Sequence, residues 1–413
     1  MLDFDSLTVS NKCMFKKCIV LILALWPWHN AFAVPYTPFE FFNAQREKEK
    51  DICSETAVAG MPPERSQDSL PICSAFSSAA IVQFQVCKKI PGACVDGKPK
   101  TMKTTVSPLS MVSWMRTNTG IGVAGNSSNF RSLQFYAGSA GASDALSNAS
   151  FGPVFVAESC YPFDQLVNEH GLENFDKVQG LVKVIENEYT KASTEGDGLC
   201  EDCLKGAAFE GAAKQLGISA GNIAGAITNA KAEKETSGQF LRDLMLGQCE
   251  DTIKFRPSQA PKFEVFPKVA GDFSYEKWIG KVKEVLSSGN PLAFDGICLE
   301  YDGPKCKTEH SVAISGYRKV CKKDPQTLDQ KVCKVSCRDV VKIHNSWGKD
   351  WQSKIAGDVG GDGEGWVDAI KLTEYVTKNK SKNKENFISI PFKRIKLILK
   401  CNYPNRHPTN NLT

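Results

Sequence analysis

A run of apolar side chains at helical spacing begins at residue 73 and ends near residue 89. Phe76, Ala80 and Phe84 follow one another at intervals of four residues, which places them on one face of a helix. A polar loop precedes the run and ends at Cys73, so the thiol falls in the first helical turn. The pattern therefore predicts a buried helix with a cysteine at its N-terminus.

Later in the chain, short apolar runs bounded by turn residues are typical of strands. Such runs occupy residues 292–297, 310–317 and 340–345. A helical pattern around Trp278 precedes them and ends at Gly289, a residue type that commonly closes helices. Because helical patterns come first and strand patterns last, the sequence predicts the α+β class.

Within the predicted strand at 340–345, successive side chains point to opposite faces of the sheet. Val341, Ile343 and Asn345 share one face, whereas His344 points the other way. His344 is therefore a poor partner for any chemistry that Asn345 carries, although the two residues are adjacent.

The N-terminus carries the pattern of an export signal. Two lysines precede the apolar run 18–28, and Ala31 and Ala33 provide the small residues of a cleavage site. Residues 1–33 are therefore assigned to a signal peptide, with translation starting at the first methionine or at Met14. The apolar run is too short to cross a bilayer, so we expect export without a membrane anchor after cleavage.

The chain contains 16 cysteines, of which 14 follow the predicted signal peptide. A reducing cytosol seldom keeps so many, so we expect most of them to form disulfides in an oxidising compartment. Close spacing favours three pairs, which are Cys87 with Cys94, Cys200 with Cys203, and Cys298 with Cys306. The C-x-x-C spacing at 200–203 also fits a redox or partial metal site, but no second pair of ligands stands at metal spacing.

The net charge of +5 arises from 51 basic and 46 acidic residues and is small for 413 residues. This balance gives no electrostatic case for binding nucleic acid. Basic residues gather between Lys378 and Lys400, where we expect a solvated edge or tail.

A cysteine in the first turn of a helix is a candidate nucleophile. The unpaired backbone N–H groups and the positive end of the helix dipole stabilise a thiolate, which would lower the pKa of Cys73 below about 8.5. Six residues upstream, the side-chain amide of Gln67 could join the backbone N–H of Cys73 in donating hydrogen bonds to an oxyanion. The alternative is a core cysteine without chemistry.

Two motifs later in the chain contain a histidine and an asparagine, each on a predicted strand. Residues 309–317 read E-H-S-V-A-I-S-G-Y, and residues 341–348 read V-K-I-H-N-S-W-G. The candidates stand in the chain in the order Gln67, Cys73, His310 and Asn345. The order of these residues and the two motifs around them resemble the papain-like cysteine peptidases. The resemblance covers residues 67–367 and is interrupted by one long insertion.

The resemblance implies a papain-like two-lobed fold, with a helical left lobe that carries the nucleophile and an antiparallel, β-barrel-like right lobe. It also implies hydrolysis of peptide bonds through a thioester. The thiolate of Cys73, paired with the imidazolium of His310, would attack the peptide carbonyl, and Asn345 would orient the imidazole ring.

The same resemblance assigns substrate-binding or supporting roles to Trp347, Ser74, Gly138, Gly141 and Glu309. Trp347 would cover the His310 ring, and Glu309 would add a modest electrostatic effect. The glycines would let an extended substrate approach the backbone, although a surface turn explains them equally well. Papain-like enzymes carry the motif C-G-S-C-W around the nucleophile, whereas residues 70–74 read L-P-I-C-S. Ser74 thus replaces a tryptophan and leaves space beside the thiol.

Cys73 and His310 stand 237 positions apart, whereas roughly 130–150 separate the pair in papain-like enzymes. We place the additional residues at 166–261, where short amphipathic runs predict a helical insertion that serves as a decorative subdomain, a substrate-selecting wall or a lid. The expected organisation is 1–33 signal peptide, 34–66 lead-in, 67–165 helical lobe, 166–261 insertion, 262–377 β-rich lobe and 378–413 basic C-terminal segment.

We expect a monomeric, exported endopeptidase that acts on polypeptides in the periplasm, in a lysosome or outside the cell. No cofactor and no metal is expected, because the acidic loop 361–366 lacks the ordered ligand spacing of a calcium site. Two alternatives remain, which are a catalytically inactive papain-like binding protein and a cell-wall peptide amidase.

Overall fold

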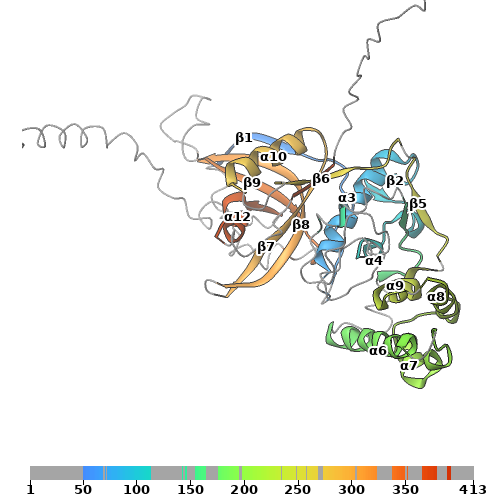
Figure 1. Cartoon of the computed structure of the whole chain (residues 1–413). Helices are drawn as coiled ribbons and strands as arrows, with labels where there is room; N and C mark the ends of the chain where they lie inside the picture. Colours follow the sequence, from blue (N-terminus) through green and yellow to red (C-terminus); the bar gives the residue numbers. More distant parts are fainter. Residues whose placement is uncertain are drawn as a thin grey trace, which may run out of the picture.

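The computed structural model describes residues 50–67, 70, 72–112, 142, 145–146, 154–163, 175–194, 198–233, 235–247, 249–256, 258–267, 273–302, 305–322, 337–348, 351, 365–378 and 388–391. Over these ranges the chain forms helices and antiparallel sheets, which confirms the predicted α+β class (Figure 1). The predicted signal peptide at 1–33 lies outside the described residues. None of the described helices is long and apolar enough to span a bilayer.

The predicted helix at residue 73 is confirmed as α3 (Cys73–Lys89). Most of its residues between Ser74 and Val86 are buried, because protein packs against it on more than one side. Lysines fill its last turn, where they suit the negative end of the helix dipole. Around α3 lie α4 (Pro108–Val112), the 3-10 turn η3 (Met102–Thr104), and the short strands β2 (Cys94–Val95), β3 (Lys98–Pro99) and β4 (Val154–Val156).

The predicted insertion is helical over most of its described length. Its elements are α6 (Phe175–Thr194), η6 (Asp202–Lys205), α7 (Ala207–Gln215), α8 (Ala220–Glu233), α9 (Ser237–Arg242), the π-turn η7 (Asp243–Gly247) and the strand β5 (Thr252–Lys254). Val178, Val182 and Ile185 form the buried face of α6 at helical spacing. The insertion and α3 contribute to one hydrophobic core, and β5 pairs with β4.

Over the described residues, the second half of the chain and β1 together build a seven-stranded antiparallel sheet. Its order is β10-β9-β8-β7-β11-β6, and β1 pairs with β8. Its strands are β1 (Lys50–Ala57), β6 (Phe263–Phe266), β7 (Leu292–Asp302), β8 (Lys305–Lys322), β9 (Cys337–His344), β10 (Trp366–Asp368) and β11 (Ile388–Pro391). Helices α10 (Tyr275–Ser287) and α12 (Ala369–Lys378) contribute to the core of this sheet. Trp278 of α10 lies 5.0 Å from Phe294 of β7, measured between ring centroids.

Two segments differ from the expected organisation. The described part of the lead-in includes β1, which pairs with β8 from Lys50 to Ala57. Residues 388–391, expected to belong to a basic tail, form β11 and pair with both β6 and β7. Strand partners so distant in sequence leave no local pattern, which explains why the sequence did not indicate them.

The structure confirms the disulfides Cys87–Cys94 and Cys200–Cys203. Cys298 is also disulfide-bonded, but its pairing with Cys306 stays a prediction because the structure does not describe the Cys306 side chain. Two further disulfides join Cys160 to Cys249 and Cys321 to Cys337. The first of these ties the helical insertion to the segment that follows β4.

Candidate active site

Cys73 opens α3 and is the only cysteine outside a disulfide among those whose side chains the structure describes. The helix packs against β7 and β8, so its first turn lies at the boundary between the helical part and the sheet (Figure 1). The Cys73 sulfur accepts hydrogen bonds from the backbone N–H of Ser311, on β8, and of Ser74. The Cys73 thiol therefore contacts Ser311, the residue that follows His310.

The pKa of the Cys73 thiol is raised to about 11, chiefly because burial disfavours the thiolate. The hydrogen bonds from Ser311 and Ser74 act in the opposite direction, whereas the negative charge of Asp295 raises the pKa further. The predicted low pKa is thus wrong for this arrangement. The residue keeps partial solvent exposure, but desolvation outweighs the favourable helix end.

His310 is buried and lies opposite Ile297 in the β7–β8 pair. Its Nε2 atom is 2.5 Å from the Oδ1 atom of Asn345, and this oxygen also accepts the backbone N–H of Ser346 at 2.8 Å. Because Oδ1 is an acceptor, the proton of the neutral ring sits on Nε2 and leaves Nδ1 as the basic nitrogen. Asn345 therefore fixes both the orientation and the tautomer of His310.

The Trp347 ring packs against the His310 ring, with 4.5 Å between the two ring centroids. Burial lowers the pKa of His310 to about 4, although the Asn345 hydrogen bond raises it slightly. Cys73 and His310 thus each favour the neutral form. Proton transfer from sulfur to nitrogen would therefore have to accompany attack on a substrate, because neither group is charged beforehand.

Gln67 is buried and its amide is held by the loop around it. Its Nε2 atom donates to the Leu70 carbonyl at 2.7 Å, and its Oε1 atom accepts the Ser346 hydroxyl. The Gln67 backbone N–H also donates to the Ser346 carbonyl at 2.7 Å. These hydrogen bonds connect Gln67 to the motif at 341–348, which contains Asn345. The role of Gln67 at an oxyanion stays a prediction.

The remaining predicted site residues have different outcomes. Ser74 is buried beside Cys73, in the first turn of α3. Glu309 is exposed and accepts the Tyr375 hydroxyl, and strand alternation turns it away from the face that holds His310. Its predicted electrostatic effect is therefore screened by water. Gly138 and Gly141 lie outside the described residues.

Sequence reasoning missed Ser311 and Asp295. Ser311 donates to the thiol through its side chain as well as its backbone. Asp295 is buried in a β-bulge that interrupts the β7–β8 register, and its Oδ1 accepts the Ala142 N–H at 2.8 Å. A charged residue inside the apolar run L-A-F-D-G-I was the one signal that could have indicated Asp295.

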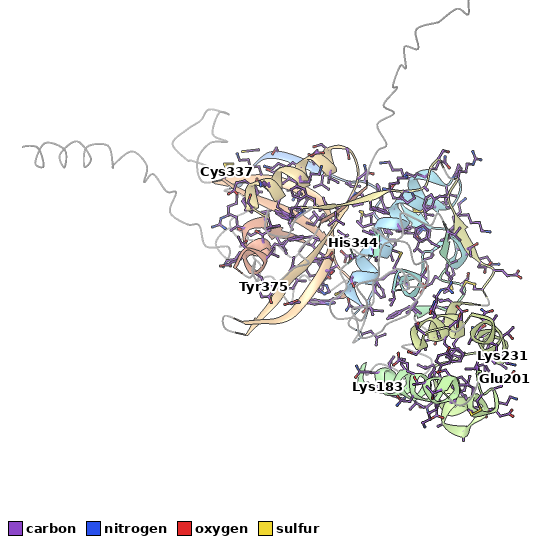
Figure 2. The ribbon with its side chains drawn as sticks, viewed as in Figure 1. Lys183, Glu201, Lys231, Cys337, His344 and Tyr375 are labelled. Carbon is purple, nitrogen blue, oxygen red and sulfur yellow. A yellow bond between two sulfur atoms is a disulfide. The ribbon has the colours of Figure 1, made fainter. Side chains whose placement is uncertain are left out.

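His344 lies at the boundary between the sheet and the helical part (Figure 2). It lines a cavity of about 240 Å³ together with Asn345, Ser346 and apolar residues of α3 such as Phe76. Cys73 does not line this cavity. Burial lowers the pKa of His344 to about 4, and the charge of Lys342 acts in the same direction. His344 therefore adjoins the candidate site through the cavity that it shares with Asn345, and its lack of a catalytic role stays a prediction.

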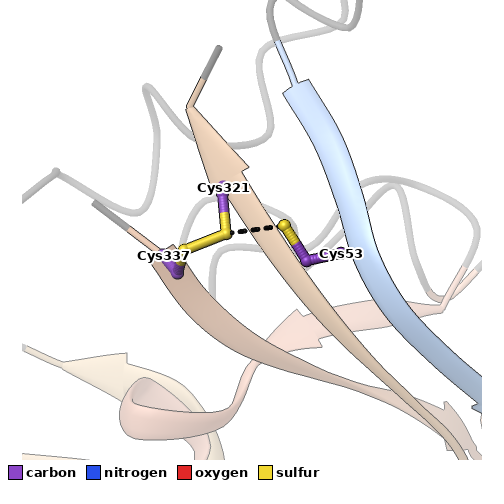
Figure 3. A group of neighbouring side chains, drawn as sticks. All are labelled: Cys53, Cys321 and Cys337. Atoms are coloured by element: carbon purple, nitrogen blue, oxygen red, sulfur yellow. Dashed lines mark hydrogen bonds between the residues drawn. A yellow bond between two sulfur atoms is a disulfide. The ribbon is translucent and has the colours of Figure 1, made fainter. Parts of the chain in front are cut away.

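The sulfur atoms of Cys53, Cys321 and Cys337 lie within 4.8 Å of one another. Figure 3 shows that Cys321 and Cys337 share a disulfide, while the Cys53 sulfur lies 3.1 Å from that of Cys321. Cys53 is disulfide-bonded as well. Metals bind thiolates, so this group offers no metal ligand while its disulfides are intact.

No protein-family model matches the chain, and no curated protein matches it at a significant level.

Proposed function

We propose that this protein is an exported cysteine peptidase with a papain-like two-lobed fold, in which Cys73 is the nucleophile and His310 the general base. The observation that carries the proposal is the hydrogen bond from His310 Nε2 to Asn345 Oδ1, together with the contact of Ser311 on the Cys73 thiol. Asn345 holds one ring nitrogen of His310 and leaves the other for proton transfer, and the residue after His310 contacts a reduced cysteine.

The fold supports the proposal by the two largest hydrophobic cores of its described residues. One core contains α3 and the helical insertion, and the other contains the sheet with α10 and α12. Cys73 comes from the first part, and His310 and Asn345 come from the second. The disulfides of the chain suit an oxidising compartment and hence export.

The chemistry follows from the protonation states. At neutral pH a His310 with a pKa of about 4 is unprotonated and can accept the thiol proton on Nδ1 as sulfur attacks a peptide carbonyl. The resulting imidazolium protonates the leaving amine, which leaves a thioester on Cys73. His310 then removes a proton from water, the hydroxide attacks the thioester, and the acid product leaves as the thiol is restored.

The catalytically inactive binding protein is a second candidate, because burial keeps the Cys73 thiol neutral. A thiol is a weaker nucleophile than a thiolate, so activity depends on His310 taking the proton during attack. The two candidates differ in whether that transfer occurs.

Covalent labelling with a thiol-directed epoxide, followed by mass spectrometry, separates the two candidates. We expect one label on the wild-type protein at Cys73, none on Cys73→Ala, and hydrolysis of casein by the wild type alone. Absence of both labelling and hydrolysis would favour the binding protein. Cleavage of peptidoglycan peptides without cleavage of casein would favour the amidase.

Replacement of Gln67 tests its proposed oxyanion role. Gln67→Ala should lower kcat by roughly 10²- to 10³-fold, the cost of losing one such donor. Burst kinetics that count labelled active sites would correct for protein that fails to fold. A loss of less than threefold per active site would refute the role.

A further inference from the structure

Residues 64–67 run alongside residues 345–347 at the edge of the candidate site. Ser66 forms an antiparallel bridge with Trp347, and the Gln67 N–H donates to the Ser346 carbonyl. Glu64 opens this segment, which the sequence assigned to the lead-in.

The Glu64 carboxylate accepts two hydrogen bonds, one from the backbone N–H of Asn345 and one from the side chain of Trp351. Its Oε1 atom lies 3.9 Å from Nδ1 of His344. The Glu64 side chain is 21% exposed, and Trp351 is almost fully buried. Burial raises the pKa of Glu64, while Trp351, Lys342 and Asn345 lower it. The carboxyl group is thus partly buried and accepts hydrogen bonds from two donors.

This contact matters because Asn345 lies just beyond the end of a strand. The β8–β9 ladder ends with the pair Ala313 and His344, so the strand itself no longer holds Asn345. Among the described residues, the Nδ2 atom of Asn345 has no hydrogen-bond partner. The Asn345 amide is therefore held through Oδ1 and through its own backbone, whose N–H donates to Glu64.

We propose that Glu64 is a positioning residue that fixes the backbone of Asn345 and, through it, the ring of His310. The inference rests on the proposed peptidase function. Glu64 moves no proton and touches no substrate. Its carboxylate joins the segment before the nucleophile to the segment that orients the base, and a small displacement of that base would lower the rate of the chemical step.

The test compares Glu64→Leu, Glu64→Gln and a matched control, Glu158→Leu. Glu158 is a buried carboxylate that also accepts a backbone N–H, from Phe163 at 2.8 Å, and it pairs with Arg65 at 2.5 Å. It therefore holds the same segment as Glu64 but has no contact with Asn345. Activity on a peptide substrate is measured per active site, with sites counted by epoxide labelling.

We expect Glu64→Leu to lower kcat roughly tenfold with KM unchanged, because orientation and not binding is lost. Glu64→Gln keeps an acceptor oxygen and should stay within threefold of the wild type. Glu158→Leu should retain kcat. Full kcat in Glu64→Leu, an equal loss in Glu158→Leu, or a tenfold loss in Glu64→Gln would each overturn the inference.

Two further measurements keep the inference separate from folding and from the proposed function. If Glu64→Leu does not fold, Glu64→Asp withdraws the carboxylate by one methylene and should give the same loss of kcat. If the wild type cleaves no peptide, the proposed function fails, and alkylation of Cys73 by iodoacetamide becomes the readout. A Glu64→Leu rate at least fivefold different from wild type would support the positioning role, and equal rates would overturn it.

Discussion

Acid should destabilise this protein through two histidines that are largely removed from water, His310 and His344, and His344 is the clearest case. Its pKa falls from 6.5 to about 4 on folding, because burial and the charge of Lys342 disfavour the protonated ring. The folded state therefore binds fewer protons than the unfolded chain between these two values. The stabilisation by neutral His344 is complete above pH 6.5 and is lost as pH falls through 4.

The size of the effect follows from the pKa difference. Each pKa unit is worth about 1.4 kcal/mol, so His344 accounts for about 3 kcal/mol. His310 has the same pKa of about 4 and adds a similar amount. Together they approach the total stability of a typical domain, about 5–15 kcal/mol. Glu64, 3.9 Å from His344, would offset part of this loss where it is ionised, but its own raised pKa limits that effect.

Urea denaturation followed by tryptophan fluorescence at pH 7, 5.5 and 4, with disulfides intact, measures the loss. The control is His344→Gln, whose side chain stays neutral throughout this range. We expect the wild type to lose about 3 kcal/mol more than His344→Gln between pH 7 and pH 4. Equal losses in the two proteins would show that His344 is not buried in its neutral form, and would refute the reasoning.

Three further predictions concern the thiol, the long-range disulfide and a backbone contact. Alkylation of Cys73 by iodoacetamide should accelerate about tenfold per pH unit from pH 7 to 10, as a pKa of about 11 requires, whereas a plateau over this range would indicate a thiolate–imidazolium pair. Replacing Cys160 and Cys249 by serine opens a loop of 89 residues and should lower the free energy of unfolding by about 4 kcal/mol, measured in urea; a loss below 1 kcal/mol would contradict this. Gly97→Ala should destabilise by about 1–3 kcal/mol more than Gly92→Ala, because both glycines have positive φ but only at Gly97 would a Cβ lie 2.6 Å from backbone; equal urea midpoints would contradict this.

The local features of the candidate site were accessible from the sequence. The helix that begins at Cys73 and the disulfides with sequence separations of 7 and 3 all follow from short-range spacing. Periodicity and loop closure act over a few residues, so the amino-acid order alone is enough to predict them.

The environment of the site was not accessible in this way. A helix N-terminus predicts a low thiol pKa, but the packing of α3 against the sheet buries the sulfur and brings Asp295 near it, so the pKa of Cys73 rises. Neither Asp295 nor Ser311 belongs to a pattern that points to Cys73. Their approach depends on the register of β7 and β8, which shifts at a bulge between Phe294 and Ile297.

By itself, the sequence determined which elements hold Cys73 and His310, because the spacing of apolar residues follows the period of a helix or a strand. Only the tertiary structure decided which groups surround the thiol and the imidazole, that β1 and β11 complete the sheet, and that Glu64 reaches Asn345. The physical reason is that burial and hydrogen bonding between distant segments set the charge and orientation of these groups, and neither is encoded in local spacing.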